Sequence, residues 1–216
     1  MTDAIGKTEL AQMFVKAAEE IRREHQYLSE LDSVAGDGDH GTTMLRVVER
    51  LEATATANTP ENLRVRLREV GWSVMGVDGG ASSALLGTFF AGMADAEIGD
   101  SSMNCTDVAK AFEAGLRAVS RQTKAQPGDK TLIDALRPAV SALSAAAARG
   151  KTIRQALKDA ALAARAGADS TKDLVARYGR AKFLGEKTRG SPDAGATSVA
   201  LLFDGFCAGF ASEGKS

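Results

Sequence analysis

Three aspartates lie close together near the start of the chain. Asp32, Asp37 and Asp39 fall within eight residues, and glycines are interspersed among them. Because neighbouring carboxylates repel one another, a fold that gathers all three needs a compensating positive charge. Mg²⁺ prefers oxygen ligands and is usually held by a few carboxylates together with substrate phosphates. Asp37 and Asp39 are two residues apart, so in an extended segment they point the same way. The spacing therefore indicates a divalent cation site, which Asp32 would complete from the preceding turn.

A solvated acidic turn is the alternative to a metal site. Asp and Gly are common turn residues, and a helix N-terminus favours negative charge. Such a turn needs only one aspartate, so the presence of three favours the metal site. Gly36, Gly38 and Gly41 match the letters of a dinucleotide-binding motif, but no β-branched strand precedes them. An EF-hand counted from Asp37 would need acids where the chain has Gly41 and Val48.

Composition indicates a folded protein without a basic surface. The 216 residues are 44% hydrophobic and 25% charged, with a net charge of −1. This composition is ordinary for a single folded domain and provides no overall positive field to attract nucleic acid. There is no apolar leader and no apolar run of membrane-spanning length, so we expect a cytoplasmic protein with no membrane partner. Cys105 and Cys207 are far apart in the sequence, and we expect both to be reduced thiols.

Hydrophobic residues recur at helical spacing through most of the chain and almost nowhere alternate as in a β-strand. Short connections favour antiparallel neighbours. The sequence therefore predicts an all-α fold, an up-and-down bundle or barrel. The expected helices cover residues 8–28, 42–55, 60–77, 81–93, 106–122, 131 to the break at Gly150, from there to 170, and 196–210.

The connections rich in glycine and charge precede alternate helices. They come before residues 42, 81, 131 and 196. In an up-and-down arrangement these connections meet at one end of the fold. Each connection alone is weak evidence for function, but together they predict a single site. The last of them, residues 178–198, is long and lacks a regular pattern. It is either a solvated basic loop or a phosphate-binding lid, and its cations are Arg180, Lys182, Lys187 and Arg189.

Five sequence blocks resemble, in order, the signature blocks of the nucleotide-binding L subunit of bacterial dihydroxyacetone (glycerone) kinases. One block would be a weak match, but five in the family's order are specific. The resemblance covers nearly the whole chain and implies a single L-type domain over residues 1–216. It also implies eight antiparallel helices with a nucleotide and metal site at one end of the barrel. The blocks are Asp32 with 36–42, then 79–82, 127–131, 179–186 and 193–198.

The resemblance also implies roles for individual residues. Asp32, Asp37 and Asp39 would be the ligands of two Mg²⁺ ions, and Arg180 would be the catalytic cation that reaches the nucleotide. Leu132 would line the base site. The full set expected to bind ADP or ATP is His40, Gly41, Thr42, Thr43, Ala81, Ser82, Thr123, Leu132, Arg180, Asp193, Ala194 and Gly195.

The activity implied is phosphoryl transfer from a Mg-nucleotide to dihydroxyacetone, or to a related ketose such as erythrulose. In this family the ketose is held covalently on a separate K subunit, so a lone L chain should be inactive. Either ATP is consumed, or bound ADP is rephosphorylated by a phosphotransferase-system protein. A homodimer is possible. Two other classes stay open: a metal-dependent all-α phosphohydrolase and a non-catalytic regulatory interaction subunit.

The chain departs from the family pattern at three positions. Thr43 stands where the family often has Asn, Ser83 where it commonly has Gly, and Ala194 where the lid usually has Pro. The first change could alter a phosphate or metal contact, and the loss of Pro frees the φ angle of the lid. No carboxylate is lost, so the departures put the sugar specificity in doubt rather than nucleotide binding.

Overall fold

The computed structural model describes residues 3–57 and 62–211. Within these residues the chain forms eight α-helices and two 3₁₀ helices, and its only β pairing is an isolated antiparallel bridge between Ile5 and Met103. The all-α prediction is confirmed. The helices are α1 (Lys7–Ser33), α2 (His40–Thr56), α3 (Leu63–Met75), α4 (Gly80–Met93), α5 (Cys105–Gln122), α6 (Ile133–Ala148), α7 (Ile153–Ser170), η1 (Thr171–Asp173), η2 (Arg180–Thr188) and α8 (Ala194–Ala211).

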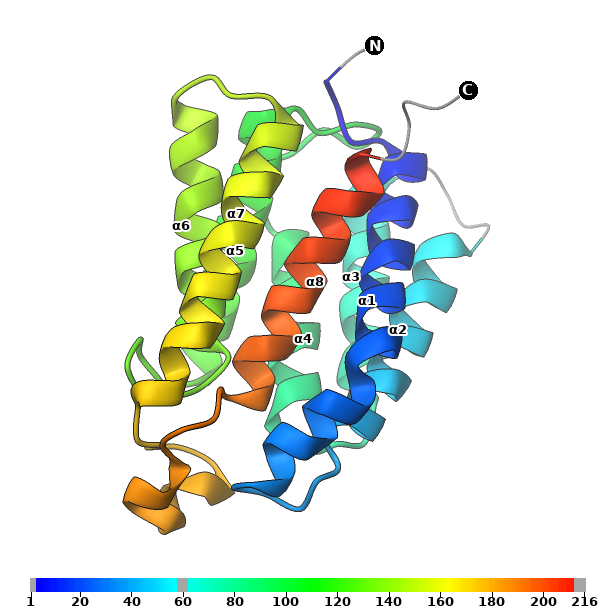
Figure 1. Cartoon of the computed structure of the whole chain (residues 1–216). Coiled ribbons are helices and arrows are strands. Elements are labelled where there is room, and N and C mark those ends of the chain that lie inside the picture. The colour runs from blue at the N-terminus through cyan, green and yellow to red at the C-terminus, as the bar shows by residue number, and fades with distance from the viewer. Residues whose placement is uncertain (1–2, 58–61, 212–216) are drawn as a thin grey trace.

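The α-helices form a closed ring. Each α-helix packs against the next one in the chain, and α8 packs against α1 (Figure 1). Successive helices run in opposite directions (Figure 1). The predicted up-and-down barrel of eight antiparallel helices is therefore confirmed. Among the described residues, none of these helices is both long and apolar enough to cross a membrane.

Phenylalanines fill the centre of the barrel. Their rings meet edge to face, with centroids 5.4–6.5 Å apart, a geometry that aromatic pairs favour. They come from four helices, so the cluster holds α1, α4, α5 and α8 together. Its members are Phe14, Phe89, Phe90, Phe112, Phe203 and Phe206.

The ring closes through a close approach of α8 to α1. Gly205 lies so near α1 that a Cβ atom on it would come 2.2 Å from the Cα of Ala17. Any larger residue at this position would push the two helices apart. The closed barrel therefore depends on a glycine at position 205.

Some predicted boundaries were wrong. Helix α1 continues to Ser33, so Asp32 lies in the last turn of a helix and not in the turn that follows one. The predicted start of the third helix, at residue 60, lies outside the described residues, and the structure begins α3 at Leu63 after the N-cap Asn62. The segment 178–198, predicted to be irregular, contains the 3₁₀ helix η2.

One end of the barrel carries the elaborate connections. The segment 174–193, which we call the lid, contains η2 and projects from this end, while the first turn of α1 and the last turn of α8 lie at the opposite end (Figure 1). The helices α2, α4, α6 and α8 all begin at the lid end (Figure 1).

Candidate functional site

A cavity of about 320 Å³ opens at the lid end of the barrel. This volume falls within the roughly 300–1,000 Å³ of typical small-molecule sites. Every connection that precedes α2, α4, α6 and α8 contributes to its wall, so the prediction that these connections meet at one end is confirmed. The wall comes from the segments 31–40, 79–85, 123–133, 176–181 and 191–195.

The three aspartates meet at this cavity. Asp32, Asp37 and Asp39 each offer a carboxylate oxygen, and these oxygens all lie within 4.8 Å of one another. Asp32 is fixed in place because the backbone N–H of Gly38 donates to its Oδ2 at 2.9 Å. A Cβ atom on Gly36 would come 2.4 Å from Asp32 Oδ1. The glycines between the acids therefore let the loop fold closely around the Asp32 carboxylate.

Asp39 occupies the N-cap position of α2 without using its side chain there. Its carboxylate makes no capping hydrogen bond. Its backbone carbonyl instead accepts from the Thr42 hydroxyl at 2.7 Å and from the Thr43 N–H at 2.9 Å. The carboxylate of Asp39 is therefore available to a ligand in the cavity.

Arg180 of the lid pairs with Asp37 across the cavity mouth. The hydrogen bond from Arg180 holds the pKa of the Asp37 carboxyl below its usual value, and the same contact raises the pKa of Arg180. Both side chains are largely exposed to solvent, so a competing cation or anion can replace either partner. The sequence separation of 143 residues shows that the lid brings a cation to the acidic loop.

The donor set fits a Mg-nucleotide. Three carboxylates with converging oxygens suit a hard divalent cation, and a single guanidinium does not balance their charge. In the wall of the same cavity, α4 begins with Gly80 after the N-cap Gly79, and no side chain caps its first turn. The free N–H groups of a helix N-terminus bind anions such as phosphate. The cavity thus offers cation ligands and anion donors side by side.

His40 forms part of the cavity wall in a neutral state. Its side chain is buried, and its Nε2 lies 2.8 Å from Ser198 Oγ of α8. Burial lowers the pKa of the imidazole below its ordinary value, so the ring is uncharged at neutral pH. The hydrogen bond to Ser198 fixes the orientation of the ring beside the acidic loop.

Three of the expected nucleotide-binding residues lie outside the cavity wall. Thr42 is exposed on α2, and Gly41 packs so closely that a Cβ on it would lie 1.9 Å from the carbonyl oxygen of His25. Thr43 is buried beneath Gly79, where an added Cβ atom would come 2.4 Å from the Thr43 methyl. Their role in nucleotide binding stays a prediction.

The other expected residues all line the cavity. Thr123 is the C-cap residue of α5, and Leu132 stands immediately before α6. Together with Asp32, Asp37, Asp39, His40 and Arg180, the structure brings to one wall Ala81, Ser82, Thr123, Leu132, Asp193, Ala194 and Gly195.

The departures from the family pattern sit in ordinary structural roles. Ser83 is buried, and its hydroxyl donates to the carbonyl of Val77 at 3.1 Å, so it does not face the cavity. Ala194 is the first residue of α8, a position where Pro is also accepted. Asp193 precedes it, and the Asp193 carboxylate accepts from the N–H of Ala196 at 2.7 Å. The start of α8 is thus held by this carboxylate in the absence of Pro.

Sequence reasoning did not select Lys130 as a site residue. Lys130 lines the cavity, is buried, and has the positive φ of 59°. Its Nζ donates to the carbonyls of Thr171 and Ser191, both at 2.6 Å, and burial lowers its pKa. These two carbonyls lie where the chain enters and leaves the lid region. Lys130 therefore links both ends of the lid region to the cavity wall. The sequence block 127–131 was the signal that could have indicated this role of Lys130.

Asp193 is the last residue of the lid. Burial raises the pKa of its carboxyl to about 6, although Lys130 opposes the shift. Its backbone N–H donates to the Thr171 hydroxyl at 2.8 Å. A titratable acid thus stands at the junction of the lid and α8.

The barrel and this site define a class of protein, a helical domain that presents an acidic cation site beside an open helix N-terminus. The profile of the DAK2 domain family matches residues 34–208, so the chain belongs to the DAK2 domain family. This confirms the family that the five sequence blocks indicated.

Similar proteins of known activity and one solved structure support this family membership. The chain is 34% identical over 203 residues to "PEP-dependent dihydroxyacetone kinase, ADP-binding subunit DhaL" of Escherichia coli (strain K12), covering 92% of this chain and 95% of that one. It is 36% identical to "L-erythrulose kinase" of Pectobacterium atrosepticum, covering 82% of this chain but 30% of that protein. The crystal structure of the dihydroxyacetone kinase from C. freundii in complex with AMP-PNP and Mg²⁺ matches with a TM-score of 0.70 and 26% identity. That match covers 92% of this chain and 33% of the other, so the chain spans about a third of that kinase.

Proposed function

We propose that this chain is the ADP- or ATP-binding subunit of a dihydroxyacetone-type ketose kinase, folded as one L-type domain. The observation that carries the proposal is the convergence of the Asp32, Asp37 and Asp39 oxygens within 4.8 Å, at a cavity that α4 also enters with its N-terminus. The relatives named as kinases support phosphoryl transfer, and the AMP-PNP and Mg²⁺ in the C. freundii structure support this ligand pair.

Asp32, Asp37 and Asp39 would hold the metal, for which we propose two Mg²⁺ ions. When bound, Mg-nucleotide supplies the phosphoryl group and neutralises the charge that develops on it during transfer. With the metal bound, Asp37 would serve as a metal ligand in place of its pairing with Arg180. The Arg180 guanidinium would then be available to donate hydrogen bonds to the transferring phosphoryl group and stabilise its negative charge.

The remaining wall residues position the nucleotide. The uncapped N–H groups around Ala81 and Ser82 donate to phosphate oxygens. Leu132 provides an apolar surface for the base, and Thr123 lines the same cavity. His40, neutral and held by Ser198, borders the phosphates without adding a charge. Gly195 lies in the first turn of α8 and lines the same cavity.

The acceptor is proposed to come from another protein. No side chain of the cavity wall is assigned as a general base, because we place that group, and the ketose, on a K-type subunit. The ketose is dihydroxyacetone or a related sugar such as erythrulose. The phosphoryl donor is either free ATP or a phosphotransferase-system protein that acts on bound ADP. A cytoplasmic location and a homodimer also stay predictions.

Asp37→Ala tests the metal site. We expect calorimetry to show loss of Mg-ADP binding, while far-UV circular dichroism keeps its helical signal, because Asp37 is exposed and buries no packing surface. Asp169→Ala is the matched control, since Asp169 is an exposed aspartate on α7 outside the cavity wall. Normal Mg-ADP affinity in Asp37→Ala would contradict the proposal and would favour a non-catalytic regulatory subunit.

Two further measurements separate the other possibilities. Phosphate release from ATP by the chain alone, at a rate that a K-type subunit does not raise, would favour a phosphohydrolase. Bound ADP that resists dialysis, together with no turnover on free ATP in the presence of the K-type subunit, would indicate the phosphotransferase-system donor. Turnover on free ATP would indicate the ATP-consuming form.

A further inference from the structure

The lid ends in an exposed aromatic tip. Phe183 is 80% exposed, the largest exposed fraction of any large apolar side chain in the part of the chain that the structure describes. Leu184 beside it is 40% exposed. Only Lys182 separates them from Arg180 and Ala181, which line the cavity. Exposing a phenyl ring to water is energetically unfavourable, because burial of its apolar surface would stabilise the protein. The tip therefore indicates a surface that another molecule covers.

The tip is held by hydrogen bonds at its base. The Thr188 hydroxyl donates to the Gly185 carbonyl at 2.8 Å and accepts from the Ala176 N–H at 3.0 Å. The Arg189 guanidinium donates to the Asp173 carbonyl at 2.6 Å. With these bonds the lid presents Phe183 in a preorganised way, which lowers the entropic cost of docking.

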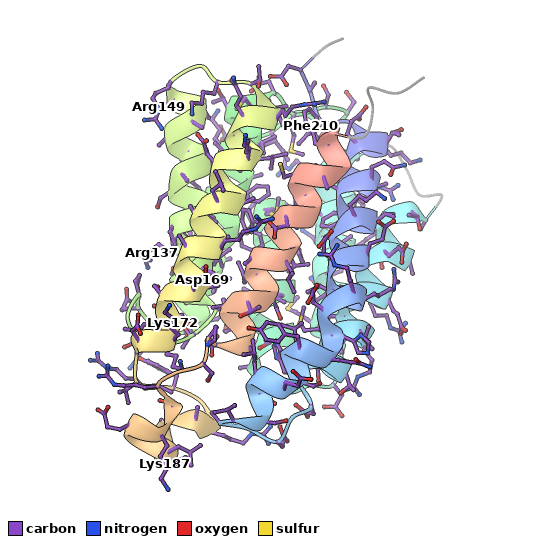
Figure 2. The ribbon with its side chains drawn as sticks, in the orientation of Figure 1. Arg137, Arg149, Asp169, Lys172, Lys187 and Phe210 are labelled. Carbon is purple, nitrogen blue, oxygen red and sulfur yellow. The ribbon has the colours of Figure 1, made fainter. Side chains whose placement is uncertain are left out.

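The tip is also positively charged. The Lys182 amino group lies 4.8 Å from the centroid of the Phe183 ring. Arg189 pairs with Glu186, whereas Lys182 and Lys187 form no ion pair with any described residue. Figure 2 shows Lys187 projecting from the end of the lid, away from the barrel. An exposed aromatic ring beside unpaired cations suits a partner that offers an apolar pocket bordered by carboxylates.

We propose that residues 182–187 of the lid dock the protein that presents the phosphoryl acceptor, through an apolar pocket for Phe183 bordered by carboxylates. The inference rests on the proposed function and adds the surface and the chemistry of the partner. The acceptor oxygen must come within about 3–3.5 Å of the phosphoryl group. Its carrier must therefore cover the cavity mouth, and the tip stands beside that mouth.

The positive charge of the tip favours a different protein as the partner and disfavours a second copy of this chain. If two lids packed tip to tip, the Lys182 and Lys187 ammonium groups of one copy would face those of the other. Like charges placed together across an interface disfavour the complex. A partner with carboxylates around an apolar pocket instead pairs with both lysines and takes up the ring.

The test uses a K-type ketose-binding subunit loaded with dihydroxyacetone as the probe. Phe183→Ala should weaken its binding about 30-fold, as expected for a hot-spot aromatic residue. Leu162→Ala is the matched control, because Leu162 is 55% exposed in the middle of α7. The double variant Lys182→Glu/Lys187→Glu should slow association about 10-fold at low salt and much less at high salt. All variants should keep wild-type affinity for Mg-ADP, since these side chains do not line the cavity.

The outcomes separate this inference from the proposed function. If the wild-type chain binds Mg-ADP and the K-type subunit, and Phe183→Ala binds the subunit as tightly as Leu162→Ala does, the docking surface is overturned while the function stands. Sedimentation showing that Phe183→Ala abolishes self-association, with binding of the K-type subunit unchanged, would assign the tip to a dimer and would also overturn it. A wild-type chain that binds neither ligand would overturn both proposals.

Discussion

Asp193 should make the stability of the protein depend on pH in a direction opposite to that of most carboxylates. Burial raises the pKa of Asp193 from 3.8 to about 6 in the folded protein. Between these two values the folded state binds more protons than the unfolded state, so the free energy of unfolding falls as pH rises. The loss is complete above about pH 6, where the buried carboxyl is charged.

The size of the effect follows from the shift in pKa. About two pKa units, at about 1.4 kcal/mol each, give a total loss of roughly 3 kcal/mol, of which about 2.4 kcal/mol falls between pH 4 and pH 7. Asp193→Asn removes the titration while keeping an oxygen that can accept from the Ala196 N–H, because Asn is also a good N-cap residue. The variant should therefore gain stability relative to the wild type as pH rises, by about 2.4 kcal/mol across this range.

Urea unfolding of both proteins at pH 4, 5, 6 and 7, without nucleotide or Mg²⁺, measures this difference directly. Subtracting the two curves removes the contributions of all other titrating groups. Asp169→Asn serves as the control, because Asp169 is an exposed aspartate outside the cavity wall. A flat or falling difference for Asp193→Asn would refute the assignment of Asp193 as a buried, destabilising charge.

Two further predictions concern the lid and the core. Lys130→Met leaves the Thr171 and Ser191 carbonyls without their donor, at about 1–3 kcal/mol each, so stopped-flow release of a fluorescent ADP analogue should be at least about 10-fold faster than from the wild type. An unchanged release rate would show that the lid does not depend on this tie. Phe112→Ala removes a ring that contacts three other phenylalanines and should lower the free energy of unfolding in urea by about 3–5 kcal/mol. A loss under about 1 kcal/mol would contradict the packing role of this ring.

The fold could be predicted because its pattern is local. Apolar residues at helical spacing mark each helix, and the abundance of short connections implies antiparallel neighbours. Helix ends were less predictable, as Asp32 shows. The aspartate suggested a turn at this position. Packing of the apolar face of α1 instead keeps the chain helical through Asp32 to Ser33. The acid thus reaches the cavity from a rigid helix end.

The site was predictable where one short segment carries the chemistry, as in the loop that contains Asp37 and Asp39. It was less predictable where burial depends on distant residues. Lys130 looks like a solvated turn lysine in the sequence, and only the carbonyls of Thr171 and Ser191, 41 and 61 residues away, reveal its role. Thr43 shows the opposite case, since its side chain lies beneath Gly79 and outside the cavity wall, so its role in nucleotide binding stays a prediction.

The placement of the lid end and the two terminal turns at opposite poles of the barrel limits how this domain can be tethered. Helix α8 has 18 residues and therefore runs about 27 Å from the cavity to its last turn. In a longer polypeptide, a linker attached there would need roughly eight extended residues just to return along the barrel. A shorter connection would hold a fused catalytic neighbour near the pole opposite the cavity, so linker length would influence whether phosphoryl transfer takes place within one chain or between chains.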